Sequence, residues 1–568
     1  MSDMSIPEKY REMLRHHAHQ YLLPAAKGEV KGLDPRKMKL GGGGRYWATA
    51  GFPAAHLAMK GLGPEREFLG SSELMDFAVA CGDFFYRDWV GKGRTTLPNE
   101  HFATTFFLDL YELVHEQLSK ARRERWRRAI QGHSEALSEA LRSKLSVNLP
   151  RHSALQVGCG PNHLYCWCAM LYRGGRVLGR AEYRRRAAWA MHKLLAAQDA
   201  SGYHAEHQGP VIHYHVVTLS GMWDYYAQSL DPASVEPLRR GAEFWCGMIY
   251  PDLTPIEVFD ERNRWHPNYA SSAQGALSMI PMGRRYISLA LDKLLAGAEV
   301  RNRPTQERRL PWHVGWMLRV LNNYHEGPQQ PLPIEDHRML HRINGLGLVR
   351  RNRSWVHALS AFCNEPWEYN PFILDRVQNL SCWHEKTGLV IGGGNDKYAP
   401  EVATFYCQEG GFVGYYRPRS GRIVPARAEH GDRIELDYGP IRAALEVKPL
   451  NEGRMRIAAD LRHWVLDLQP NLNLQLRLVP GSTLRLAGSK TVKLTRSTRK
   501  TRTIDTGGRV GTEQWELVGP KDMQLHWPHF PYNSYQKDRF NDIHAAVGIA
   551  TVPFPREGGH VELELRIR

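Results

Sequence analysis

The chain has 568 residues, of which 42% are hydrophobic and 24% charged, with 51 glycines and 34 prolines that follow no period. This composition is typical of a large folded protein, and it excludes a disordered or collagen-like chain. The formal net charge of +16 favours an acidic partner, and no run of 18 apolar residues predicts a membrane helix.

The N-terminus, MSDMSIPEKYREMLRHHAH, lacks the apolar core of a signal peptide. The chain is therefore either cytoplasmic, or secreted or periplasmic with its leader removed. Eight cysteines are too few for a disulfide scaffold. Cys166-Trp-Cys168 has no second pair at zinc-site spacing, which favours a helix interior over a zinc site.

Residues 1 to about 340 have the periodicity of helices. Phe102, Phe106, Leu110 and Leu113, for example, place apolar side chains on one helical face. Helices are predicted over about 74–85, 102–113, 122–144, 161–173, 183–194, 213–229, 235–249, 284–297 and 311–324.

After about residue 350 the pattern changes to short segments in which apolar and polar residues alternate, separated by turn residues. These segments cover 388–391, 412–416, 433–438, 443–447, 455–461, 474–478 and 560–567. Such spacing is typical of an antiparallel sandwich. A helical half before a strand half implies two packed domains. We expect a helical domain over 1–340 and a β-sandwich over 350–568, with a proline-containing linker near 326–350.

A basic stretch lies between residues 485 and 509 of the strand half. It contains Arg485, Lys490, Lys493, Arg496, Arg499, Lys500, Arg502 and Arg509. A solvated strand edge, which such charges protect from aggregation, is favoured over a loop that contacts a polyanion. No zinc-finger spacing or RNA-binding motif occurs, so a nucleic-acid partner would rest on charge alone.

Two neighbouring segments could carry chemistry. In Gly158-Cys-Gly-Pro-Asn-His163, Asn162 either caps a helix or presents its amide beside His163 at a helix N-terminus that attracts a carboxylate. The stretch from Asp199 to His215 then holds four histidines, two tyrosines and a glutamate. Zinc binding, proton transfer by His and Tyr, and aromatic packing at a helix start all stay open for it.

Two further segments are candidates for substrate contact. Arg262 and Arg264 could hold carboxylates while Trp265 stacks on a sugar ring, or the segment could be an ordinary polar loop. Trp383-His384 could face the helical domain, or could be a buried tryptophan with a satisfied histidine. The glycines at 392–394 lack the Lys-Ser/Thr of a phosphate loop and suit a strand corner.

Together these segments resemble the toroid polysaccharide lyases, which include heparinase II/III-like enzymes, alginate lyases and, more distantly, hyaluronate and chondroitin lyases. The domain layout is similar over nearly the whole chain. The motifs match over 158–215, with a weaker match over 376–395. The resemblance implies an incomplete (α/α) toroid as the catalytic domain over 1–340, followed by the antiparallel β-sandwich.

The resemblance also implies roles for single residues. Asn162 would neutralise a uronate carboxylate with His163 beside it, and His207 and Tyr214 would transfer protons. The residues expected to bind substrate are Tyr203, His204, Glu206, Arg262, Arg264, Trp265 and His384. The spacing from His207 to Tyr214 is shorter than in the hyaluronate lyases, which leaves Tyr203 and His213 as competitors of Tyr214.

The implied reaction is β-elimination from a uronic acid within an acidic polysaccharide. We expect no cofactor in catalysis, although a structural zinc or calcium would be compatible, and neither a nucleic-acid nor a membrane partner. Two alternatives stay open. One is a glycoside hydrolase on a similar toroid that uses carboxylates such as Glu206, Asp224 and Asp260. The other is a protein that binds acidic glycans without cleaving them.

Overall fold

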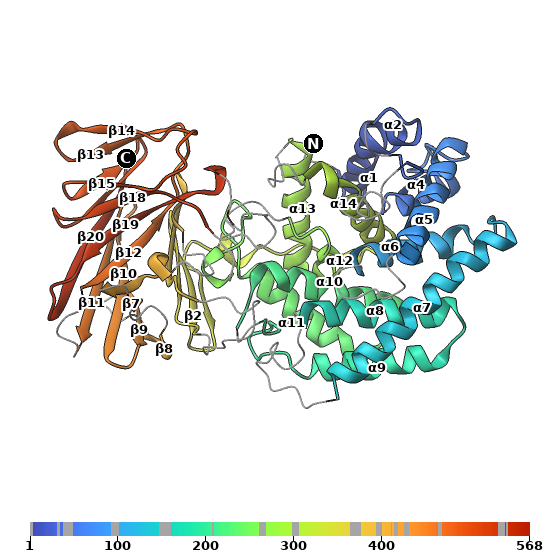
Figure 1. The fold of residues 1–568 in the computed structure, drawn as a ribbon, viewed down its shortest axis with the longest axis horizontal. Helices are drawn as coiled ribbons and strands as arrows, with labels where there is room; N and C mark the ends of the chain where they lie inside the picture. Colours follow the sequence, from blue (N-terminus) through green and yellow to red (C-terminus); the bar gives the residue numbers. More distant parts are fainter. Residues whose placement is uncertain are drawn as a thin grey trace. The chain divides into compact units, whose positions relative to one another are not determined.

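The structure is a computed structural model that describes residues 4–30, 34–37, 49–91, 101–146, 161–206, 209–260, 269–297, 306–363, 376–392, 400–409, 412–413, 418–424, 426, 431–463, 469–531, 540 and 543–568. The chain forms two compact units. The first contains Met1–Glu206, Tyr214–Cys246 and His266–Leu332, and the second contains His207–His213, Gly247–Trp265 and Pro333–Arg568. Helices precede antiparallel sheets along the chain, which confirms the predicted fold class (Figure 1).

Nine helices of the described residues overlap the nine predicted ranges, because apolar residues recur along them at helical spacing. The helix bounds are α1 Ile6–His17, α2 Leu23–Ala26, α4 Gly51–Lys60, α5 Ser72–Gly91, α6 His101–Val114, α7 Lys120–Lys144, α8 Pro161–Val177, α9 Ala181–Leu195, α10 Ile212–Ser229, α11 Val235–Cys246, α12 Gln274–Ser278, α13 Pro281–Leu295 and α14 Gln306–Asn322. Helices α1, α2, α4 and α12 were not predicted, although Ser5 and Glu8 form a capping box at the start of α1. Among the helices of the described residues, none is long and apolar enough to cross a membrane.

Helices α8 and α10 run parallel to each other. The Cys166 thiol lies 3.8 Å from the Val217 carbonyl, and further along Arg173 bonds Asp224, each pair being 51 positions apart in the chain. A Cβ at Gly221 would come within 2.6 Å of the Cys166 nitrogen, so glycine permits this close approach. The first turns of α8 and α10 therefore lie at the same end of the helical unit.

The second unit contains two antiparallel sheets. The larger has the strand order β1-β2-β3-β4-β5-β12-β19-β18-β15, with β6 and β7 off this path, and the smaller has the order β14-β13-β16-β17-β20-β11-β10-β9-β8. The bounds are β1 Leu340–Ile343, β2 Gly347–Asn352, β3 Trp355–Ser360, β4 Leu380–His384, β5 Gly388–Gly392, β6 Phe405–Glu409, β7 Phe412–Val413, β8 Ser420–Val424, β9 Asp432–Asp437, β10 Ile441–Asn451, β11 Arg454–His463, β12 Pro470–Leu476, β13 Thr483–Leu486, β14 Thr491–Lys493, β15 Arg502–Asp505, β16 Arg509–Gly511, β17 Trp515–Val518, β18 Gln524–His529, β19 Val547–Pro553 and β20 Gly558–Ile567.

The core of this unit combines residues from both sheets. Leu359 and Leu474 of the larger sheet belong to the same buried cluster as Leu445 and Ile457 of the smaller one. The two sheets therefore pack face to face, as predicted for a sandwich. Strand structure already begins at Leu340, inside the segment that the sequence suggested as a linker. The part of the predicted strand 412–416 beyond Val413 lies outside the described residues.

Candidate active site at the start of α8

Asn162 lies in the first turn of α8, directly after Pro161. Pro161 is the first helical residue, so Asn162 is inside the helix and is not its N-cap, contrary to one of the two interpretations of the sequence. Its side-chain Nδ2 donates to Oε1 of Glu206 (2.7 Å), and its backbone N–H donates to Oε2 (3.3 Å). The buried Glu206 carboxylate thus occupies the positive end of α8, where a helix favours an anion.

This contact fixes the orientation of the Asn162 amide. The nitrogen must face Glu206, because a carboxylate only accepts hydrogen bonds. The amide group has a second N–H and a carbonyl oxygen with which to contact another molecule. Glu206 was predicted to bind substrate directly, and in the structure it holds the residue that was predicted to neutralise the substrate.

The loop that contains Glu206 has a second contact with α8, between His204 of the loop and Tyr165, which lies one turn after Asn162. The Tyr165 hydroxyl lies 3.0 Å from the Leu194 carbonyl and 2.5 Å from Nδ1 of His204. Because a phenol has one hydrogen, Tyr165 donates to the carbonyl and accepts from Nδ1–H of His204. Burial lowers the pKa of His204 well below its usual value, so its imidazole is neutral. The loop before residue 207 is therefore fastened at His204 and at Glu206.

Tyr214 and His163 occupy the first turns of α10 and α8, and both are half-buried. The two helices run parallel, so these two first turns lie at the same end of the helical unit. Burial lowers the pKa of His163 to about 4, so this imidazole is neutral at neutral pH and is a weaker base than a free histidine. Tyr203, the competitor of Tyr214, is buried and packs on Phe244 with ring centroids 5.4 Å apart.

The other histidines of the predicted cluster have separate environments. Nε2 of His215 donates to the Gly241 carbonyl (2.8 Å), and the backbone N–H of His213 donates to Asp260 (3.1 Å). Within the described ranges, no group of three or more His, Cys, Asp or Glu side chains could hold a metal ion. Cys166 and Cys168 lie in the interior of α8, as expected. Four predicted residues, His207, Arg262, Arg264 and Trp265, lie outside the described residues.

His384 lies in β4 of the sheet unit and uses both ring nitrogens there. Nε2 donates to the Glu452 carbonyl (2.8 Å), and Nδ1 accepts from the backbone N–H of Lys386 (3.1 Å). Its neighbour Trp383 donates to Asp252 (3.2 Å) and stacks on Tyr250. These contacts favour a structural role for His384 over the predicted role in substrate binding.

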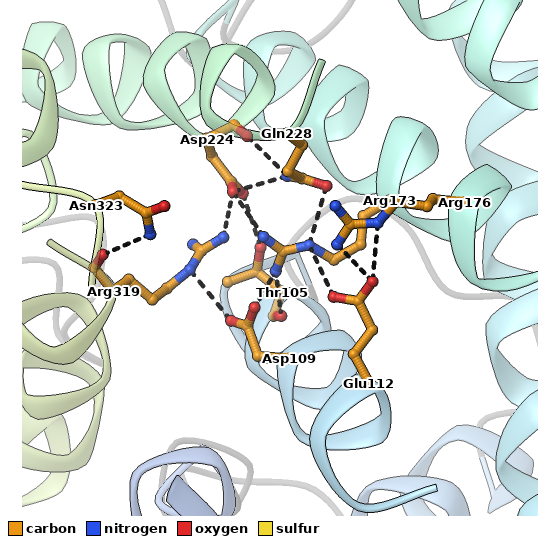
Figure 2. A network of polar contacts seen from close by, with 9 residues as sticks. All are labelled: Thr105, Asp109, Glu112, Arg173, Arg176, Asp224, Gln228, Arg319 and Asn323. Carbon is orange, nitrogen blue, oxygen red and sulfur yellow. Dashed lines mark hydrogen bonds and ion pairs between the residues drawn. The ribbon is translucent and has the colours of Figure 1, made fainter. Parts of the chain in front are cut away.

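A second polar cluster, which the sequence reading missed, lies at the C-terminal halves of the inner helices (Figure 2). Arg173 of α8 and Arg319 of α14 each pair with both Asp109 of α6 and Asp224 of α10, with 3.1 Å between Arg173 and Asp224 and between Arg319 and Asp109. The four buried side chains form a closed ring of alternating charge, which we call the Arg–Asp ring. The arginines lower the pKa of Asp224, although burial alone would raise it.

The Arg–Asp ring is part of the lining of a pocket of about 320 Å³ between α4, α6, α8, α10 and α14. Arg173 follows Asn162 by three helical turns, which at 1.5 Å per residue is about 16 Å along α8. This pocket is thus separate from the candidate site. Because its charges are paired with one another, the ring is better suited to joining four helices than to chemistry.

No protein-family profile matches the sequence, and no curated protein matches it. Solved structures do match. Heparinase III aligns with a TM-score of 0.54 at 10% identity over 91% of this chain and 76% of its own. A Streptomyces coelicolor chondroitin AC lyase in complex with chondroitin sulphate aligns with a TM-score of 0.53 at 11% identity, over 99% and 79%. A second heparinase III gives 0.51 at 10% identity, over 97% and 84%. The chain therefore has the fold of these polysaccharide lyases.

Proposed function

We propose that this protein is a polysaccharide lyase that cleaves a uronic-acid-containing polysaccharide by β-elimination. One observation carries the proposal. Asn162 and Tyr214 occupy the first turns of two parallel helices, at the same end of the helical unit. The fold shared with heparinase III and chondroitin AC lyase supports it.

The residues suit each requirement of that reaction. A base removes the proton at C5, the bond from C4 to the glycosidic oxygen breaks, a C4–C5 double bond forms, and the leaving oxygen takes a proton. The second N–H of Asn162 and the N-terminus of α8 can stabilise the charge that develops on the uronate carboxylate. By resemblance His207 would act as the base and the Tyr214 hydroxyl as the acid, whereas the pKa of about 4 makes the neighbouring His163 a weak base that is better suited to contact substrate.

Glu206 adds a constraint on how the substrate binds. Its carboxylate already accepts from the Asn162 amide and backbone. A uronate carboxylate must therefore use the second N–H of Asn162 beside Glu206, or displace Glu206 from it. Either arrangement brings two carboxylates together, so cationic side chains of the protein are needed to balance their charge.

The hydrolase alternative is weakened by the positions of its candidate carboxylates. Hydrolysis of a glycosidic bond needs one carboxyl as an acid and a second as a nucleophile or base. Asp224 belongs to the Arg–Asp ring, Asp260 accepts from the first turn of α10, and Glu206 caps α8. Each of the three carboxylates thus has a structural partner that an acid or nucleophile would have to give up.

We also propose that catalysis needs no metal. His204 and His215, two of the four clustered histidines, each direct a ring nitrogen at a protein partner within the helical unit. Activity should therefore survive dialysis against a chelator. Loss of activity that added zinc restores would contradict this part of the proposal.

The proposal is tested by incubating the protein with a panel of uronate polymers, sulfated and unsulfated. A lyase leaves a C4–C5 double bond conjugated to the carboxylate, which absorbs in the ultraviolet, whereas a hydrolase leaves only new reducing ends. Rising absorbance with at least one polymer is expected. New reducing ends without absorbance would show a hydrolase, and binding without either product would show a glycan-binding protein.

A further inference from the structure

The sheet unit carries an uninterrupted series of cations. Lysine or arginine occurs at every third position from 490 to 502, with one further lysine at position 500, and no Asp or Glu occurs from Leu486 to Ile504. We call these six side chains the basic ribbon: Lys490, Lys493, Arg496, Arg499, Lys500 and Arg502. All six are exposed to solvent.

The basic ribbon lies along the chain segment that connects the outer strands of the two sheets. Strand β14 is the last strand of the smaller sheet and β15 the last of the larger sheet's main path, and residues 494–501 connect them. The buried Leu494 and a hydrogen bond from Thr501 to the Pro528 carbonyl (2.8 Å) hold this connection against the sandwich. The backbone N–H of Ala487 donates to the Thr506 carbonyl (3.2 Å), so β13 and β15 end side by side (Figure 1).

The six side chains of the basic ribbon have no acidic partners, unlike several other cations of this unit. Arg422 pairs with Glu435, and Arg454 pairs with Glu564. No carboxylate in the part of the chain that the structure describes pairs with any of the six ribbon side chains. Six like charges on a short stretch repel one another, so the ribbon lowers the stability of the isolated protein.

Protection of sheet edges does not account for the whole ribbon. The outer strands β14 and β15 each carry one of the six cations, Lys493 and Arg502, as the opposite outer strands β1 and β8 each carry one arginine. Three of the six cations, Arg496, Arg499 and Lys500, lie in the connection 494–501, which presents no strand edge to protect.

We propose that the basic ribbon is a docking surface for an acidic polysaccharide chain. The cations are spread along an exposed stretch rather than gathered in a pocket, which suits a linear polymer with repeated negative charges. Serine and threonine hydroxyls alternate with them and can bond sugar hydroxyls or sulfates. No aromatic residue occurs from 489 to 503, whereas surfaces for single-stranded nucleic acid use aromatic rings to stack the bases. This surface would bind polymer even if the helical unit had no lyase activity.

The test compares two triple variants with the same loss of charge, both in a Tyr214→Phe background so that cleavage cannot remove the polymer. The ribbon variant is Lys490→Gln, Arg496→Gln and Arg499→Gln. The control, on exposed arginines of α7 and α9, is Arg128→Gln, Arg184→Gln and Arg185→Gln. Affinity for heparin at low salt should fall about tenfold or more in the ribbon variant, since charge-based contacts add along a polymer, and should change little in the control.

Three results would overturn the proposal: unchanged affinity in the ribbon variant, an equal loss in the control, or tighter binding of single-stranded DNA through the same side chains. The last result would identify a nucleic acid as the partner. Turnover of a short uronate oligosaccharide by the ribbon variant with Tyr214 intact should equal that of the unmodified protein. This second measurement separates failure of the docking surface from failure of the proposed lyase.

Discussion

We expect Tyr165 to position the residues of the candidate site without contacting substrate itself. Its hydroxyl accepts from His204, two positions before the residue that holds Asn162. Tyr165→Phe removes this acceptor and leaves a buried N–H of His204 unpaired, at a cost of about 1–3 kcal/mol. We expect kcat to fall severalfold, because Glu206 and Asn162 lose their fixed positions, with a smaller change in KM.

The matched control for this prediction is Tyr172→Phe, on the same helix, where the ring packs on Tyr225. It should leave kcat unchanged. If Tyr165→Phe loses stability but keeps full kcat, the hydroxyl has a structural role only and does not position the site.

Asn162 is expected to act on the transition state. Asn162→Ala should lower turnover by about 10²-fold or more, as removal of one oxyanion-type donor does in other enzymes. It should also lower the free energy of unfolding by about 1–3 kcal/mol, because Glu206 loses an amide donor. Turnover and urea unfolding measured on the same preparation separate the two effects. An unstable variant with full activity would show that Asn162 only anchors Glu206.

At the scale of elements, the Arg–Asp ring joins four helices through buried charges. Asp224→Ala would leave Arg173 and Arg319 sharing Asp109, with Glu112 as a more distant partner of Arg173 at 3.8 Å. Removing one partner of a buried ion pair costs about 3–5 kcal/mol, so a large loss of stability to urea is expected. Glu139→Ala, which breaks the exposed pair with Arg142, is the control and should cause no measurable change. A similar small effect in both variants would show that the ring does not hold the helices together.

The Arg–Asp ring shows that pairs of residues on different helices cannot be predicted from the sequence of each helix alone. Each charged residue of the ring interrupts an apolar stretch, as in Met170-Leu-Tyr-Arg173, and such an interruption indicates a buried charge. The other three are Asp109, Asp224 and Arg319. Local periodicity places each on its helix. Local periodicity does not indicate which of these residues pair with one another, because the paired residues are at least 51 positions apart in the chain.

At the scale of the whole molecule, the order of helices and strands could be predicted because apolar residues repeat with periods of 3.6 and 2. Positions inside the candidate site could be predicted only in part. Asn162, His163 and Tyr214 do lie in the first turns of helices. Nothing local distinguishes His384, whose ring bonds the backbones of Lys386 and Glu452, from a histidine that faces substrate. That distinction depends on tertiary contacts.

The helical unit should lose stability as the pH falls from about 6.5 towards 4. Burial lowers the pKa of His17, His56, His163 and His215 from 6.5 to about 4 each. Below pH 6.5 the unfolded chain binds protons that the folded chain does not, so unfolding becomes easier. The slope is up to about 1.4 kcal/mol per pH unit for each histidine.

Urea unfolding of the full chain between pH 7.5 and 5 checks this prediction. His56→Leu should reduce the slope, whereas His192→Gln, at an exposed position of α9, should not. Stability that stays constant or rises as the pH falls through 6 would contradict it.

Proton transfer by Tyr214 in a β-elimination is tested most directly by Tyr214→Phe, assayed by ultraviolet absorbance on whichever uronate polymer the unmodified protein cleaves. The change removes one oxygen and leaves the ring in the first turn of α10, so folding and polymer binding should be retained. Binding with nearly complete loss of absorbance is the predicted result. A Phe variant that still produces the unsaturated uronate at the normal rate would contradict the assignment and with it the proposed site.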